Sequence, residues 1–245
     1  MKMRFTPLKS FICSLFLGFH PALACEIELV IAMDVSRSVD QYEFDLMRSG
    51  TANAFRHPEI IDMINWMDGG IAVSLTQWSG LDKQRVMLPW RHLQDKSSIA
   101  RFATEIDQMK RAFRFEFTAP AQGLSHAFSM FAQNPTQCER KVIDLSGDGR
   151  ANQGESTGQM ASLIAGLGVT INGLVIRGDH PDPLEFYVND IQRGPLSFVE
   201  IADGYDDFPR AIFQKIQREI APLYSENTPK LRQAPPRKLA GKSAF

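Results

Sequence analysis

The sequence of 245 residues lacks several features that would identify a protein class. It has almost no net charge, −1 from 27 basic and 28 acidic residues, so the chain as a whole carries no polyanion-binding signature. It has no series of long apolar runs, and 44% hydrophobic with 22% charged residues is an ordinary globular composition. These absences exclude a collagen, a wholly disordered chain and a multi-span membrane protein.

The small net charge conceals an uneven distribution. Residues 1–24 hold three basic residues and no acid, and residues 225–245 hold five basic residues and one acid. The segment between them, residues 25–224, therefore has 19 basic and 27 acidic residues, a net charge of −8. An acidic body disfavours nucleic acid as a partner and favours a cation.

The two ends of the chain differ from its body. Residues 1–24 predict a secretory signal peptide, because a basic start is followed by the short apolar run Phe11–Phe19 and the cleavage pattern Ala22-Leu23-Ala24. We expect a mature chain that begins near Cys25 and is periplasmic or secreted; an uncleaved N-terminal anchor is the alternative. Residues 225–245 have two adjacent prolines and no apolar periodicity, which predicts a disordered basic tail.

Cysteine is scarce, with three residues in the chain, and Cys13 leaves with the predicted signal peptide. Cys25 and Cys138 remain as an even pair in an oxidising compartment, each just before a predicted strand. If these strands are parallel neighbours, a disulfide is expected, worth on the order of 4 kcal/mol in the chain-entropy model. Two buried free thiols are one alternative. Lipidation of Cys25 is another, although lipoprotein signals resemble Leu-x-x-Cys and this chain has Ala22 at the leucine position.

Short apolar runs alternate with helical stripes along the body of the chain. We expect strands at residues 27–33, 71–78, 84–88, 141–146, 169–176 and 198–202. We expect helices at residues 39–56, 95–110, 119–132, 157–167, 184–191 and 208–220. This alternation favours right-handed crossovers and predicts one three-layer α/β/α domain over residues 25–224, with a mostly parallel, doubly wound, Rossmann-like sheet.

Ligands of open parallel sheets bind beyond the carboxyl ends of the strands. Asp34, Ser36 and Ser38 follow the first predicted strand, and alternate residues of an extended segment share a side. Asp148, within Gly147-Asp148-Gly149, follows the predicted strand at residues 141–146. Two carboxylates and several neutral oxygens suit a hard divalent cation, Mg²⁺ or Mn²⁺.

These residues also have ordinary structural roles. Asp34 or either serine can serve as the N-cap of the following helix, and Asp148-Gly149 is a common turn sequence. Asp144 lies inside an apolar strand, where a carboxylate must be paired or hydrogen-bonded. Support of a metal site and plain structural pairing both stay open for Asp144.

The motif Asp34-x-Ser36-x-Ser38 after an apolar strand resembles the D-x-S-x-S metal motif of von Willebrand factor type A and integrin I-like domains. Thr118, in Phe117-Thr118-Ala119-Pro120, and Asp148 match the two further parts of that family's metal ion-dependent adhesion site (MIDAS). The resemblance covers nearly all of residues 27–220. The chain is also similar to a secreted bacterial group of type A-like proteins of unknown function, in which Ser-Gly-Asp-Gly replaces Thr-Asp-Gly.

The resemblance implies a metal site with an incomplete set of ligands. Its predicted ligands of Mg²⁺ or Mn²⁺, directly or through water, are Asp34, Ser36, Ser38, Thr118 and Asp148. Asn152 is expected to support the Asp148 loop without binding the metal itself. An open coordination position would accept an acidic side chain of a protein partner. The expected function is an exported, metal-dependent, adhesion-type binding module that is not an enzyme, has no nucleic-acid partner and has no membrane span in the mature chain.

The alternative function is a metal-assisted, phosphatase-like hydrolase that uses Asp34 and Asp148. Such enzymes resemble this chain in placing an aspartate after the first parallel strand, but they need a second acid two residues later, where this chain has Ser36. No G-x-G-x-x-G, P-loop, nucleophile elbow or Ser-His-Asp arrangement is evident in the sequence.

Overall fold

The computed structural model describes residues 25–178 and 180–221, so the predicted signal peptide and the predicted tail at residues 225–245 lie outside the described residues. A six-stranded sheet runs in the order β3-β2-β1-β4-β5-β6. Of the pairs within this sheet, β2–β3 is antiparallel and the other four are parallel. The strands are β1 (Cys25–Asp34), β2 (Ile71–Trp78), β3 (Gln84–Leu93), β4 (Cys138–Gly147), β5 (Val169–Ile176) and β6 (Val199–Ala202).

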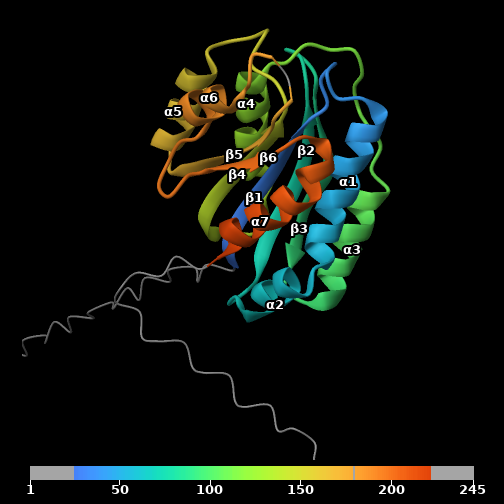
Figure 1. Cartoon of the computed structure of the whole chain (residues 1–245). Coiled ribbons are helices and arrows are strands. Elements are labelled where there is room, and N and C mark those ends of the chain that lie inside the picture. The colour runs from blue at the N-terminus through green and yellow to red at the C-terminus, as the bar shows by residue number, and fades with distance from the viewer. Residues whose placement is uncertain (1–24, 179, 222–245) are drawn as a thin grey trace, which may run out of the picture.

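Helices cover both faces of the sheet, which confirms the predicted three-layer α/β/α fold (Figure 1). One face packs against α1 (Gln41–Arg56), α2 (Pro58–Trp66), α3 (Lys96–Asp107) and α7 (Phe208–Ile220). The other packs against α4 (Pro120–Met130), α5 (Thr157–Gly166), α6 (Leu184–Phe186) and the helical turn Tyr187–Ile191. No helix within the described residues is long and apolar enough to cross a membrane.

The central strand β1 is almost continuously apolar because both of its faces are buried. Leu29 and Ile31 belong to the core cluster beneath α1, α3 and α7, whereas Val30 and Ala32 belong to the cluster beneath α4 and α5. A strand buried on both faces has no solvent side on which polar residues would alternate with apolar ones. The observed register, from Cys25 opposite Cys138 to Met33 opposite Ser146, brings the end of β1 beside the end of β4.

Two parts of the fold differ from the sequence prediction. Helix α2 is absent from the prediction, because its buried residues are limited to Ile60 and Ile64, too few to give a clear helical stripe. Strand β3 continues to Leu93 instead of ending at Pro89. Proline is tolerated there because β3 is an edge strand and its pairing with β2 shifts register at this point, where Pro89 has no paired residue.

The predicted disulfide between Cys25 and Cys138 is present. The two residues are directly aligned on the parallel neighbours β1 and β4, with their Cα atoms 4.5 Å apart. Both cysteines are the first residues of these strands as the structure has them, rather than lying before them. The bond therefore ties the two strands whose opposite ends carry the predicted metal ligands.

We expect replacement of both cysteines by serine to destabilise the protein. The disulfide closes a loop with a sequence separation of 113 residues, and the chain-entropy model then gives about 4 to 5 kcal/mol of stabilisation. Urea unfolding of the double variant, compared with the oxidised wild type, measures this loss. An unchanged unfolding midpoint would show that the bridge does not contribute to stability.

Candidate metal site

The end of β1 is shaped by the side chain of Asp34. Its Oδ1 atom accepts a hydrogen bond of 2.7 Å from the backbone N–H of Ser36, a local turn that aspartate commonly forms. The N-cap of α1 is instead Asp40, which forms a reciprocal capping box with Glu43. None of the three residues of the Asp34-x-Ser36-x-Ser38 motif is therefore used to cap the helix.

The end of β4 meets this turn. Ser38 Oγ donates a hydrogen bond of 2.8 Å to Asp148 Oδ1, and the hydroxyl oxygens of Ser36 and Ser38 are 3.4 Å apart. The contact joins residues 110 positions apart in the sequence, because β1 and β4 are adjacent parallel strands aligned up to Met33 and Ser146. The structure thus brings together the two predicted carboxylate-bearing stretches at one edge of the sheet.

Thr118 approaches the same edge on the segment before α4. Its N–H donates to Asn152 Oδ1 at 2.8 Å, and its carbonyl oxygen accepts from the N–H of Asn152 at 3.1 Å. A cavity of about 560 Å³ is lined by both Thr118 and Ser38. Through these two hydrogen bonds Asn152, which follows Asp148 in the same loop, is joined to Thr118.

The carboxylate of Asp34 is in an unusual electrostatic position. The residue is fully buried, and its Oδ2 atom has no hydrogen-bond partner within the described part of the chain. Burial, and then the charge of Asp148, raise the pKa of Asp34 well above its usual range. The Arg111 guanidinium donates hydrogen bonds to the carbonyls of Val35 and Ser36. A bound cation would offset both the free-energy cost of burying the Asp34 charge and its repulsion by Asp148.

Close packing explains why the first glycine of Ser146-Gly147-Asp148-Gly149 has no side chain. A Cβ atom at this position would lie 2.7 Å from Asp34 Oδ2 and 2.7 Å from the hydroxyl of Tyr187. No side chain fits there without displacing one of these groups. The glycine therefore lets the end of β4 pack directly against the Asp34 carboxylate.

Tyr205 completes the surroundings of Asp148 and was not found from the sequence. Its hydroxyl donates a hydrogen bond of 2.8 Å to Asp148 Oδ2, and burial together with the charge of Asp148 raises the pKa of Tyr205 well above its usual range. Tyr205 lies 57 residues after Asp148 and belongs to no recognisable motif. Only the tertiary fold brings the two residues into contact.

The donor set fits a hard divalent cation. It comprises two carboxylates and three hydroxyls from three separate stretches of chain, and oxygen ligands of this kind suit Mg²⁺ or Mn²⁺. Across residues 25–178 and 180–221, no group of three or more His, Cys, Asp or Glu side chains is arranged to hold a metal.

A family model described as "Protein of unknown function (DUF1194)" matches residues 24–224. The chain belongs to the DUF1194 family. Its fold is that of von Willebrand factor type A domains, so the resemblance inferred from the three motifs is confirmed at the level of family and fold. No curated protein matches the sequence.

Solved structures share this fold at low identity. A von Willebrand factor type A protein from Catenulispora acidiphila is 18% identical with a TM-score of 0.58, over 80% of this chain and 43% of that one. Proximal thread matrix protein 1 of the mussel byssus, with a zinc-occupied MIDAS motif, is 18% identical with a TM-score of 0.57, over 80% and 46%. The PilB minor pilin of Streptococcus sanguinis is 14% identical with a TM-score of 0.59, over 80% and 61%. The DUF1194 chain therefore spans less than two thirds of each of these proteins.

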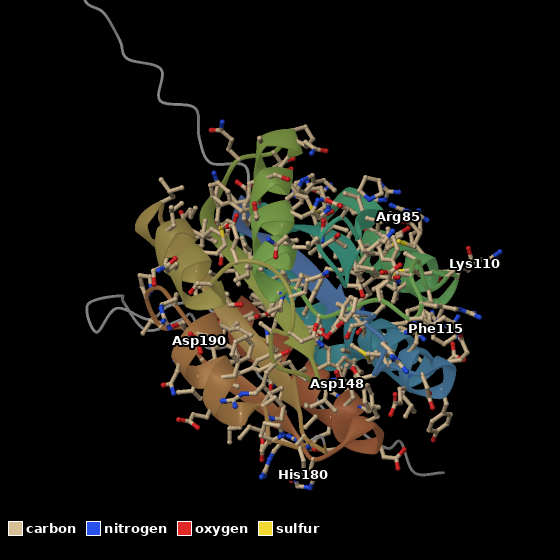
Figure 2. All side chains as sticks on the ribbon, turned by 90° about the horizontal axis from the view of Figure 1, so that it is seen from above. Arg85, Lys110, Phe115, Asp148, His180 and Asp190 are labelled. Carbon is tan, nitrogen blue, oxygen red and sulfur yellow. A yellow bond between two sulfur atoms is a disulfide. The ribbon has the colours of Figure 1, made fainter. Side chains whose placement is uncertain are left out.

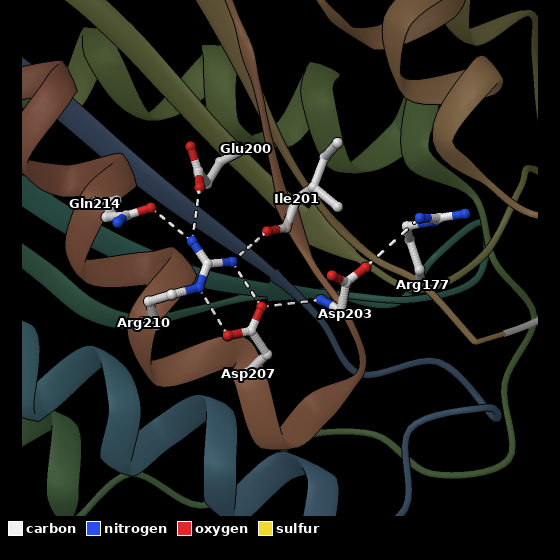
Figure 3. A network of polar contacts seen from close by, with 7 residues as sticks. All are labelled: Arg177, Glu200, Ile201, Asp203, Asp207, Arg210 and Gln214. Carbon is white, nitrogen blue, oxygen red and sulfur yellow. Dashed lines mark hydrogen bonds and ion pairs between the residues drawn. The ribbon is translucent and has the colours of Figure 1, made fainter.

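The segment that carries Tyr205 in this DUF1194 protein is held by an ion-pair network (Figure 3). Arg210, in the first turns of α7, pairs with Asp207 at 2.6 Å and with Glu200 of β6 at 3.3 Å. The backbone N–H of Asp203 also donates to Asp207 Oδ2 at 3.0 Å. These contacts fix the β6–α7 connection and so the position from which Tyr205 reaches the candidate site.

Asp144 pairs with α7 rather than with a residue of the candidate site. Its Oδ1 atom lies 2.8 Å from Lys215 Nζ, which also contacts Glu219 Oε1 at 2.5 Å. All three side chains are buried. One lysine cannot neutralise two ionised carboxylates, and burial raises the pKa of Glu219 to about 7 and raises that of Asp144 as well.

This buried cluster predicts a pH-dependent stability. The pKa of Glu219 is raised from 4.5 in the unfolded chain to about 7 in the folded protein, so the folded state binds more protons between these pH values. The free energy of unfolding should therefore fall as the pH rises through this window, by up to about 3 kcal/mol. Glu219→Gln should make this slope shallower in urea unfolding measured with a chelator present, while the raised pKa values of Asp144 and Asp34 leave a residual slope of the same sign. The exposed control Glu155→Gln should keep it, and equal slopes in both variants would contradict the assignment.

Proposed function

We propose that this DUF1194 protein is an exported, metal-dependent protein-binding module of the adhesion type. In this proposal Asp34, Ser36, Ser38, Thr118 and Asp148 hold Mg²⁺ or Mn²⁺ directly or through water. The observation that carries the proposal is the buried, unpartnered Oδ2 atom of Asp34 beside a second carboxylate. Burying two neighbouring acids without a cation is unfavourable, whereas a divalent cation would make the same arrangement stabilising.

The ligand set also supports a role in binding. With only Asp34 and Asp148 as anionic ligands, a bound divalent cation remains able to attract a further carboxylate. Ser38, one of the proposed ligands, is exposed at the strand ends, so a group from solvent could approach the site there. A glutamate or aspartate of a protein partner would complete the coordination.

Several observations support an exported location and an adhesion-type role. The disulfide is typical of an oxidising compartment, and residues 1–24 have the pattern of a signal peptide. The mussel matrix protein, with zinc at its MIDAS motif, supports a divalent cation at this place in the fold. The pilus adhesin SpaC of Lactobacillus rhamnosus GG and the PilB minor pilin, which share the fold, support an adhesion-type role.

Divalent metal should stabilise the protein through the proposed site. At a free Mg²⁺ concentration of about 100 times the dissociation constant, linkage predicts about 2.7 kcal/mol, which corresponds to a rise in Tm of roughly 5 to 10 °C. Asp34→Ala should abolish the rise, and Asp62→Ala on the exposed face of α2 should keep it. Thermal unfolding of the wild type and of the two variants, each with Mg²⁺ and with EDTA, measures these changes in Tm. Equal melting of the wild type in the two conditions would refute the site.

Replacing Asp34 by asparagine tests the contribution of its negative charge separately from that of its size and hydrogen bonding. Asparagine can still accept the Ser36 N–H bond, but it removes the buried charge that repels Asp148. We therefore expect Asp34→Asn to melt no lower than the wild type in EDTA, and to gain nothing from Mg²⁺. A large loss of stability in EDTA would instead show that the carboxylate is needed by the fold itself.

Partner capture tests the binding function directly. The full chain, immobilised in Mg²⁺, should retain a protein from the exported protein fraction of its source that EDTA releases. Asp34→Ala should not retain it, whereas Asp62→Ala should. Retention that is the same for the Asp34 variant, or that is insensitive to EDTA, would contradict a metal-dependent module.

A further inference from the structure

The candidate metal site opens on one side into the 560 Å³ cavity, here called the flanking pocket. Its lining includes Ser38 and Thr118, two of the proposed metal ligands, so a group bound to the metal would extend directly into it. Away from these ligands its lining includes Arg37, Phe115, Phe117, Arg150 and His180. In the view from above, Asp148 lies between Phe115 and His180 (Figure 2).

Two phenylalanines of the flanking pocket face solvent. Phe115 is 83% exposed and Phe117 is 59% exposed. Phe115 also has a φ of 62°, a left-handed conformation that is unfavourable for a bulky side chain. The segment is nevertheless held in place, since the carbonyl of Glu116 accepts a 2.9 Å hydrogen bond from the N–H of Arg37. Exposed aromatic side chains on a fixed loop beside a site are typical of a surface that binds another molecule.

The flanking pocket is also cationic. Arg37 and Arg150 are exposed, and their guanidinium groups form no hydrogen bond or ion pair with any other described residue. The one acid of the lining, Glu116, lies 3.7 Å from Lys83 and is paired with it. Two arginines are therefore available to meet negative charge brought by a partner.

A second cavity beside the site has the reverse character. This cavity of about 420 Å³ is lined by Ser38, Asp148 and Tyr205 together with the acids Asp40 and Asp206. Its arginine, Arg177, is already paired with Asp182 at 2.6 Å. An acidic segment is thus repelled on this side and attracted on the side of the flanking pocket. Residues 25–224 carry a net charge of −8, so the cationic flanking pocket is an exception on an acidic body. An acidic partner segment would therefore be directed to this pocket rather than to the rest of the surface.

We propose that the flanking pocket receives a partner segment that carries a large apolar side chain and a second carboxylate beside the acid that binds the metal. The apolar group packs against Phe115 and Phe117, and the second carboxylate pairs with Arg37 or Arg150. The inference rests on the proposed function, since it takes the metal-bound acid as its starting point. It adds that the partner carries a large apolar side chain and a second carboxylate close to that acid.

A random peptide library displayed on phage provides the probe. Phages bound to the full-length protein in Mg²⁺ are released with EDTA and sequenced. We expect the released peptides to combine two acids with a large apolar residue between or beside them. Peptides enriched in a single acid without an apolar neighbour, or in lysine and arginine, would overturn the proposal. So would the absence of any EDTA-released peptide.

Variants of the protein then assign the contacts. For a selected peptide, Arg150→Glu and Arg37→Glu together should weaken binding by at least about tenfold, and Phe117→Ser by about tenfold. Arg101→Glu on α3 and Leu163→Ser on α5, where Leu163 is 64% exposed, are matched controls that should bind normally. Equal affinity of the pocket variants and these controls would contradict the proposed surface.

The outcome also separates this inference from the proposed function. The pocket variants should keep the Mg²⁺-dependent rise in Tm, because they leave every proposed ligand unchanged. If that rise is present and no selected peptide depends on Phe117 or on the two arginines, the flanking pocket proposal fails alone. If the wild type shows no rise in Tm with Mg²⁺, the metal site itself fails.

Discussion

The arrangement depends on one electrostatic constraint, the approach of two carboxylates at the ends of two adjacent parallel strands. Asp34 is fully buried with one oxygen unpartnered within the described chain, and Asp148 raises its pKa from the neighbouring strand. The surrounding residues are arranged to maintain this contact rather than to relieve it. A Cβ atom at Gly147 would lie 2.7 Å from Asp34 Oδ2, so the end of β4 can pack against this carboxylate only with glycine at this position. Ser38, which follows the turn formed by Asp34, donates a hydrogen bond to Asp148 Oδ1.

The rest of the fold fixes the two strands on which these acids lie. The disulfide joins β1 and β4 at the opposite end, and both faces of β1 are buried in the core. The C-terminal part of the domain is attached to β4 and its end through Tyr205 at Asp148, through Lys215 of α7 at Asp144, and through the carbonyl of Glu219, which accepts a hydrogen bond from Arg140. The carboxyl end of β4 is therefore held both by its neighbouring strand and by the helix packed on the sheet, which keeps the acids in a fixed relative position.

Much of this could be predicted from sequence because the signals are local. Apolar runs that alternate with helical stripes predict the layers, and the spacing of Asp34, Ser36 and Ser38 places three oxygen-bearing side chains on one turn. Local signals could not reveal contacts made across the fold. Tyr205 is in no motif, and the pairing of Asn152 with Thr118 depends on how two loops pack. The buried lysine of α7 resembles any polar residue of an amphipathic helix until its partner Asp144 is seen.

The central claim is that the two strand ends form a single site for a divalent cation. Calorimetric titration of Mn²⁺ into the metal-free protein tests it most directly, with Asp148→Asn as the paired variant. The account predicts one ion bound per chain by the wild type and none by the variant. Binding that survives unchanged in the variant, or no binding by the wild type, would contradict it.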